Sequence, residues 1–208
     1  MDYIVMDLEW NQNPYGKNNN HPDIPFEIIE IGAVKVNNDL EIIDEYKQIV
    51  KPRIYKKLHY KIQEITHLTM EELNSGEDFR KVIRSFLNWC GDDYIFCTWG
   101  TMDLTELQKN MKHYGMERIL DFPLFYVDLQ KMYSLCYEDG HVKRTLSYAV
   151  EELNIKEDTL IGQLVYIGEG LTLGSSNPEG LAAFSRIVAA AEDIFVSIHD
   201  GCSKFQFI

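Results

Sequence analysis

The alternation of apolar and polar positions predicts a strand at the start of the chain. In the segment DYIVMDLEWN (2–11), side chains that alternate across a strand place Asp7 and Glu9 on one face and Leu8 and Trp10 on the other. Acidic residues are depleted in strands, and two like charges about 4 Å apart cost about 1 to 4 kcal/mol. Two acids on one strand face therefore predict a cation beside them.

Two further β-branched runs predict a hairpin. They cover residues 27–37 and 40–50, and the Asn- and Asp-rich turn NND joins them. The Asn-, Pro- and Gly-rich stretch 11–25 is typical of a loop. The first three strands are therefore expected to form an antiparallel meander.

From residue 66 onward, helical and strand patterns alternate. An acid-rich helical stretch follows THLT (66–69), and apolar residues at helical spacing predict a helix over residues 79–90 that Gly91 ends. A short apolar strand (93–98), a helix closed by Gly115, a strand ending near Asp128 and a helix capped by Thr145 follow. This order predicts an α/β protein whose sheet begins antiparallel and becomes parallel.

The last fifty residues have a different character. Residues 160–180 mix small, apolar and glycine residues, in which a short hairpin is one reading. An Ala-rich helix is expected after them, with Asn177 as its N-cap, Pro178 at its first position and Gly201 at its end.

Composition narrows the class of protein. The chain has 208 residues, 45% of them hydrophobic, which suits one globular domain with a sizeable core. There is no apolar run of about 18 residues and no signal-peptide pattern, so no membrane association and a cytoplasmic location are expected. The four cysteines form no metal-binding or disulfide pattern and are expected as reduced thiols, mostly in the core.

The net charge and the local charge of the chain point in opposite directions on nucleic-acid binding. The net charge of −13 argues against a general electrostatic surface for it. The segment KQIVKPRIYKKLHYK (47–61) is nevertheless basic, with two tyrosines interleaved. It can be a surface that holds a phosphate backbone and stacks a base, or simply a solvated loop, and the pattern alone leaves both open.

Carboxylates are the main candidates for chemistry. Active residues of open α/β sheets gather at the carboxyl ends of strands, where Asp7, Glu9 and Asp103 are expected. Asp193, in the mostly apolar AAAEDIFVSIH, is a possible fourth acid. Several carboxylates can clamp two divalent ions for an in-line phosphoryl displacement. Asp103 can instead be a helix N-terminal acid, and Asp193 a surface acid; Asp128 is expected mainly to cap a helix.

At these residues the chain resembles the DEDD superfamily of 3′-to-5′ exonucleases. VMDLEWN is similar to the first motif, FEIIEIGAVKV to the strand after it, and IFCTWGTMDLTELQKNM to the second motif. ITHLT and LSYAVEELNI extend the likeness over residues 1–158. The resemblance implies a ribonuclease H-like α/β fold, a five-stranded mixed sheet flanked by helices, in a single domain of residues 1–208 whose part 159–208 is divergent.

The resemblance also implies an activity. It is that of an exonuclease that releases nucleoside 5′-monophosphates from the 3′ end of single-stranded RNA or DNA. The implied ligands of two Mg²⁺ or Mn²⁺ ions are Asp7, Glu9, Asp103 and Asp193. The implied substrate contacts are the stretch Leu8, Glu9, Trp10 and Asn11, chiefly through its backbone, together with Trp99, Met102 and His67.

The third motif departs from the family pattern. The His-type branch has His five residues before the last Asp and the Tyr-type branch has Tyr four before, whereas this chain has Val188 and Ala189 there. His199 is one candidate for a displaced general base. Two alternatives remain: a nucleic-acid-binding module that has lost the chemistry, and a phosphodiesterase for small nucleotides. The sequence does not indicate RNA or DNA, or an oligomeric state.

Overall fold

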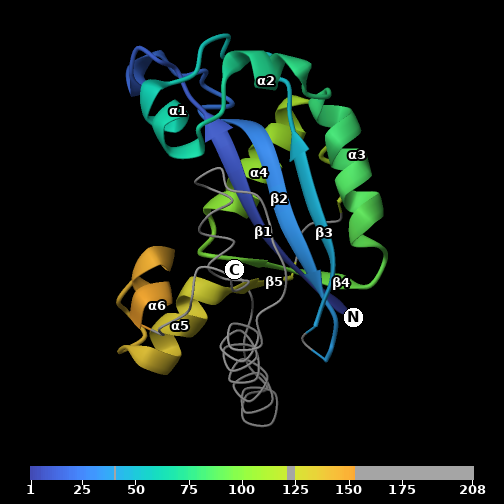
Figure 1. The fold of residues 1–208 in the computed structure, drawn as a ribbon, viewed down its shortest axis with the longest axis vertical. Helices are drawn as coiled ribbons and strands as arrows, with labels where there is room; N and C mark the ends of the chain where they lie inside the picture. The colour runs from blue at the N-terminus through green and yellow to red at the C-terminus, as the bar shows by residue number, and fades with distance from the viewer. Residues whose placement is uncertain (40, 121–124, 153–208) are drawn as a thin grey trace.

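The computed structural model describes residues 1–39, 41–120 and 125–152, which form a mixed sheet with helices packed against it (Figure 1). The five strands lie in the order β3-β2-β1-β4-β5. Their bounds are β1 (Asp2–Asn11), β2 (Glu27–Val36), β3 (Ile42–Ile49), β4 (Tyr94–Thr98) and β5 (Tyr126–Asp128). The predicted five-stranded mixed sheet is therefore confirmed.

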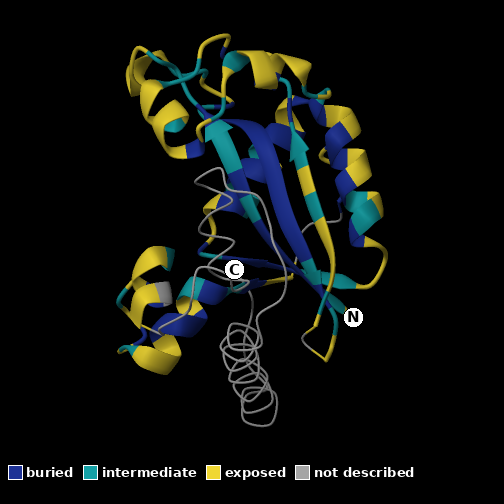
Figure 2. Cartoon of the chain, in the orientation of Figure 1, coloured by how far each residue is buried: buried dark blue, intermediate teal, exposed yellow. Residues whose placement is uncertain are grey.

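The strand pairing follows the predicted change from antiparallel to parallel. β1 pairs with β2, and β2 with β3, in antiparallel register, which is the expected meander. β4 pairs with β1, and β5 with β4, in parallel register. Figure 2 shows the inner strand β2 buried along its length and the edge strand β3 partly exposed. β1 therefore lies at the centre of the sheet.

Most helices begin and end where their capping residues predict. The helices are α1 (Tyr60–Thr66), α2 (Met70–Ser75), α3 (Phe79–Cys90), α4 (Met102–His113), α5 (Leu129–Tyr137) and α6 (Leu146–Glu152), with a 3₁₀ turn η1 (Lys17–Asn19). Thr69 and Glu72 form a capping box on α2, and Gly91 ends α3 at a positive φ of 86°. The expected helix at 177–201 and hairpin at 160–180 lie outside the described residues.

Helix α1 was not expected from the basic segment. The side chain of His59 caps it by accepting from the N–H of Lys61 at 3.3 Å. His67 ends it in the left-handed conformation, with φ 55°. A histidine N-cap is not among the preferred capping residues, which is why the sequence pattern gave no helix start here.

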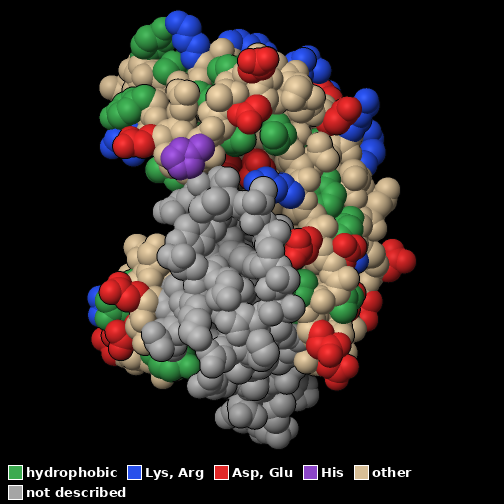
Figure 3. Space-filling view, in the orientation of Figure 1, with side chains coloured by type: hydrophobic (Ala, Val, Ile, Leu, Met, Phe, Trp, Pro, Cys, Tyr) green, Lys and Arg blue, Asp and Glu red, His purple; other side chains and the backbone are tan. Residues whose placement is uncertain are grey.

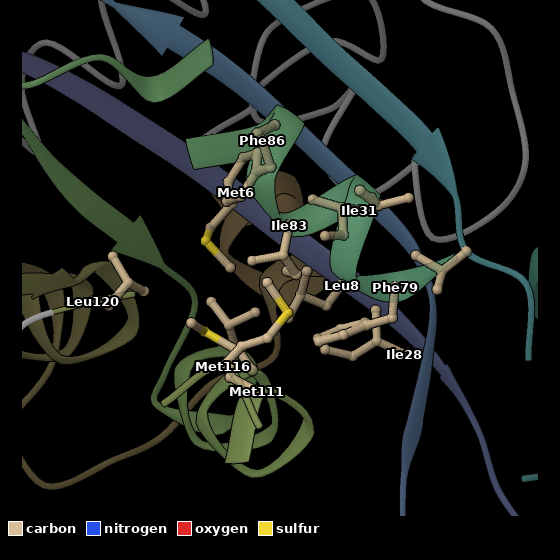
Figure 4. Packing of buried hydrophobic residues seen from close by; sticks show 14 of the residues in the cluster. Met6, Leu8, Ile28, Ile31, Phe79, Ile83, Phe86, Met111, Met116 and Leu120 are labelled. Carbon is tan, nitrogen blue, oxygen red and sulfur yellow. The ribbon is translucent and has the colours of Figure 1, made fainter. Parts of the chain in front are cut away.

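The hydrophobic core fills one face of the sheet. Met6 and Leu8 of β1 and Ile31 of β2 contact Phe86 of α3 and Met111 of α4 in one buried cluster (Figure 4). Helices α3 and α4 therefore cover the face that carries the even-numbered residues of β1. The residues on the other face, Asp7 and Glu9 among them, are excluded from this core.

Two polar side chains fix the segment before α1. Buried Glu27 accepts hydrogen bonds from the backbone N–H groups of Arg53, Ile54 and Tyr55 and from the hydroxyl of Tyr114. Buried Asn11, the last residue of β1, donates to the carbonyl of Lys57 at 2.9 Å and accepts from the N–H of His59 at 3.0 Å. The start of α1 is therefore tied to the carboxyl end of β1.

The cysteines and the helices bear on two expectations from composition: reduced thiols mostly in the core, and no membrane span. Cys90 and Cys97 are buried free thiols as expected, but Cys136 on α5 is exposed, because it lies on the solvent side of that helix. Cys202 lies outside the described residues. In the described part of the chain, no helix has the length and apolar character needed to cross a bilayer.

Candidate active site

The acids of β1 lie on the sheet face that α3 and α4 leave uncovered. Asp7 and Glu9 are half-buried, and Leu8 packs in the core on the opposite face. Trp10 also packs against the core, with its ring centroid 6.0 Å from that of Phe26. The predicted division of β1 into an acidic and an apolar face is confirmed.

Helix α4 brings a third acid to the same strand. Asp103 is buried in the first turn of α4, and its Oδ1 accepts from the backbone N–H of Leu8 at 3.1 Å. β4 pairs with β1 only as far as Val5, so the N–H of Leu8 has no partner in that strand. Asp103 therefore completes the hydrogen bonding of β1 beyond the end of β4, where Asp7 and Glu9 lie.

Asp128 fixes the turn that places Asp103. As expected, it caps a helix: its Oδ1 accepts from the N–H of Lys131 in α5 at 2.9 Å. The same oxygen accepts from the N–H of Gly100 at 3.2 Å, in the turn between β4 and α4. Gly100 has φ 86°, a conformation that side chains disfavour. This contact holds the start of α4 against the sheet.

Burial raises the pKa of all three acids, and neighbouring charges add to the shift at Asp7 and Glu9. Burial raises the pKa of Asp7, and the charges of Asp103 and Glu30 raise it further. Burial also raises the pKa of Glu9 to about 9, with the charges of Asp7, Glu30 and Asp103 acting in the same direction and Lys47 opposing them. Burial raises the pKa of Asp103, which the N–H of Leu8 partly offsets. The site therefore holds more negative charge than its surroundings neutralise.

Glu30 on β2 is a fourth acid of this face that the sequence reasoning missed. It is paired directly with Glu9 across the antiparallel ladder, and its Oε1 lies 3.4 Å from Nζ of Lys47 on β3. Burial raises the pKa of Glu30, and Lys47 opposes that shift. Glu30 could have been found from the sequence, because it is an acid inside the apolar run FEIIEIGAVKV. Asp7 and Glu9 were identified as candidates by the same pattern, an acid within an apolar strand.

These donors suit a hard divalent cation. Carboxylate oxygens are the ligands that Mg²⁺ and Mn²⁺ prefer, and a cation would relieve the repulsion among the acids. Oε2 of Glu30 is buried and has no hydrogen-bond partner in the described residues. Within those residues, no three His, Cys, Asp or Glu side chains are already gathered around a common point. Cation binding at these acids therefore requires a further ligand or a rotation of their side chains.

The other predicted site residues differ in burial and in their contacts. Asn11 is buried and holds the segment before α1, whereas His67 is exposed at the end of that helix. Trp99 donates from its indole nitrogen to the carbonyl of Arg144 at 3.1 Å, and Met102 is exposed at the start of α4. Asp193 and His199 lie outside the described residues.

A mixed α/β sheet with acids at the carboxyl end of its central strand is the architecture of ribonuclease H-like nucleases. The family model of the RNase T exonucleases matches residues 4–160, and the chain belongs to this exonuclease family. The expected fold and family are therefore confirmed.

Curated relatives and solved structures agree with this placement. A PolC-type DNA polymerase III of Clostridium perfringens is 29% identical over 114 residues, which are 55% of this chain but 7% of the polymerase. A 3′-exonuclease that recognises the 3′ end of a histone mRNA stem-loop has a TM-score of 0.63 at 22% identity, covering 97% of this chain and 83% of that one. E. coli exonuclease I, in complex with a dA16 oligonucleotide, has a TM-score of 0.62 at 12% identity, covering 95% and 43%. These two structures share the fold.

Proposed function

We propose that the chain is a metal-dependent 3′-to-5′ exonuclease that hydrolyses single-stranded RNA or DNA to nucleoside 5′-monophosphates. The observation that carries this proposal is the hydrogen bond of Asp103 to β1 at Leu8, between Asp7 and Glu9, in a chain of the exonuclease family. The repulsion among these acids supports a site that is completed by cations, because carboxylates that raise one another's pKa bind a divalent ion in place of protons.

In this proposal the acids act as ligands. Asp7, Glu9 and Asp103 hold two Mg²⁺ or Mn²⁺ ions, which when bound activate water and stabilise the leaving oxygen. Asp103 also keeps its carboxylate fixed through the N–H of Leu8, so that little reorganisation is needed when a substrate phosphate binds. The backbone from Glu9 to Asn11, together with Trp99, Met102 and His67, contacts the terminal nucleotide.

The divergent C-terminal part supplies the remaining groups in this proposal. Asp193 is the fourth acid, and His199 is the general base in place of the residues that the family motif expects at 188 and 189. Loss of a general base costs about 10² to 10⁴ in rate, so a chain without one is a slow enzyme. The sequence Val188-Ala189 also favours a second candidate function, a module that binds nucleic acid without cleaving it.

A surface at the start of α1 supports single-stranded nucleic acid as the substrate. We call Tyr15, Lys57, His59 and Tyr60 the α1 face. The ring of Tyr60 is 65% exposed and stacks on the ring of His59 at 4.9 Å and 25°, and Nζ of Lys57 donates to the hydroxyl of Tyr15 at 3.1 Å. Figure 3 shows basic and hydrophobic side chains together at this end of the molecule. Exposed rings beside cations suit bases and phosphates.

The experiment that tests this function is a time course on 5′-labelled single-stranded RNA and DNA with Mg²⁺ or Mn²⁺. A ladder of progressively shortened products is expected, and its loss in His199→Ala would identify the base. Oligonucleotide binding without products at high enzyme concentration would establish the binding module instead. Cleavage of a chromogenic phosphodiester with intact oligonucleotides would indicate the small-nucleotide phosphodiesterase.

Tyr60→Ala is expected to weaken oligonucleotide binding about tenfold. Stacking of one base on an aromatic ring contributes about 1 to 3 kcal/mol, and about 1.4 kcal/mol is a factor of ten in Kd. Fluorescence anisotropy of a labelled single strand, at fixed salt and without divalent cation, measures this change. Tyr60→Phe keeps the ring and is expected to bind as the wild type does. Equal Kd values for Tyr60→Ala and the wild type would show that the α1 face does not bind the substrate.

A further inference from the structure

Glu9 and Glu30 stand directly opposite each other across the β1–β2 ladder. Side chains in such a pair have Cβ atoms about 4.5 to 5.5 Å apart, and like charges there destabilise a sheet. Glu30 is almost fully buried, with a side chain that is 3% exposed, so water screens this repulsion poorly. Two glutamates at this position are therefore unfavourable for the fold alone.

Lys47 neutralises only part of this charge. It is paired with Gly32 on β2, which is in turn paired with Asp7 on β1, so the three residues form one row across the sheet. Gly32 places no side chain between Lys47 and Asp7 in this row. The ammonium group reaches Oε1 of Glu30 at 3.4 Å, whereas Oε2 of Glu30 is buried without a hydrogen-bond partner in the described residues.

We propose that Glu30, held by Lys47, is a positioning residue for divalent-cation binding at Glu9. This inference rests on the proposed function. Lys47 fixes one oxygen of Glu30, and the other oxygen then acts on the acidic face in two ways. Its charge turns the Glu9 carboxylate away from β2 and towards Asp7, and it offers one more hydrogen-bond acceptor beside a hydrated cation. Groups that orient metal ligands in this way typically contribute a factor of 10 to 100 in metal affinity.

A purely structural role for the pair makes a different prediction. Removing one partner of a buried ion pair typically destabilises the fold, because the other charge is left buried and uncompensated. A structural Glu30–Lys47 pair would therefore change the unfolding temperature of its variants but not their affinity for cations.

The test is Mn²⁺ binding by calorimetry to the full chain, alone and without nucleic acid. Glu30→Gln is expected to bind Mn²⁺ 10- to 100-fold more weakly than the wild type, and the Mn²⁺ concentration for half-maximal nuclease activity is expected to rise in parallel. Glu106→Gln is the matched control. Glu106 is also a buried glutamate with one oxygen 2.7 Å from a lysine, Lys109, and the other without a partner in the described residues. Its variant is expected to bind Mn²⁺ as the wild type does.

The outcomes separate this inference from the proposed function. Equal Mn²⁺ affinity of Glu30→Gln and the wild type, with binding lost in Asp7→Asn, would overturn the positioning role and leave the exonuclease proposal standing. A wild type that binds no Mn²⁺ would overturn both. If circular dichroism shows that Glu30→Gln is unfolded, Glu30→Asp takes its place. It keeps the charge but withdraws it by one methylene, and at least a threefold loss of Mn²⁺ affinity is expected.

Discussion

Asp7→Asn is expected to lower the rate of oligonucleotide shortening by at least about 10³-fold, which corresponds to about 4 kcal/mol of transition-state stabilisation. The charges of Asp103 and Glu30 raise the pKa of Asp7, and the charge of Asp7 raises that of Glu9, so Asp7 interacts with all the other acids of this face. An amide of the same shape keeps the packing but gives up one of the anionic oxygens that hold the cations. The time course with Mn²⁺ measures the effect directly.

A control is needed because a misfolded chain would also be inactive. Asp92→Asn neutralises an exposed acid in the turn before β4 and is expected to keep the full rate. Asp7→Asn is expected to unfold at the same temperature as the wild type or higher, because it removes one of several mutually repelling charges. A rate within tenfold of the wild type in Asp7→Asn would show that the acids of β1 are not the catalytic ligands.

The strand pattern predicted the acidic face of β1 because a two-residue period depends only on local sequence. The alternation that separates Asp7 and Glu9 from Leu8 holds in the structure, up to an irregularity in register after Glu9. The placement of Asp103 followed from the same kind of reasoning, since the carboxyl ends of parallel strands meet at one edge of a sheet. Its hydrogen bond to the N–H of Leu8 spans 95 positions in the chain.

What the sequence could not give was the register between strands. Glu30 faces Glu9 only because β1 and β2 pair with that register, and Lys47 joins them only because β3 is staggered by the same hairpin. A shift of one residue would have turned Glu30 into the core. Helix α1 was missed for a related reason: Glu27 and Asn11, both distant in sequence, hold its start in place.

The burial of Glu9 and its repulsion by the neighbouring acids predict a second large effect, in the stability of the metal-free protein. The pKa of Glu9 is raised to about 9, so the folded state holds its proton at pH values where the unfolded state has released it. The folded state is then destabilised progressively as the pH rises from about 4.5 to about 9, and the loss is complete above the folded pKa. Glu9→Gln carries no such proton, so it is expected to be more stable than the wild type at pH 8.

We expect this difference in the free energy of unfolding to be about 2 to 4 kcal/mol at pH 8 in EDTA. One pKa unit corresponds to about 1.4 kcal/mol, and the value is reduced because Glu9 is only half-buried and solvent screens its charge. Near pH 4.5 the difference should be small, because Glu9 is then protonated in the folded state and half protonated in the unfolded state. Urea denaturation of the two proteins across this pH range measures it, and a difference that does not change with pH would show that repulsion at Glu9 is negligible.

Mn²⁺ should reduce the stability advantage of Glu9→Gln over the wild type. A ligand at 100 times its Kd stabilises the folded state by about 2.7 kcal/mol, and the wild type gains this while Glu9→Gln, which has lost a ligand, gains less. Glu71→Gln, a substitution in the first turn of α2 away from the acidic face, is the matched control and should follow the wild type in both conditions. If Mn²⁺ stabilised Glu9→Gln and the wild type equally, the carboxylate of Glu9 would not be a ligand. The unfavourable charge on β1 would then have no compensation in cation binding.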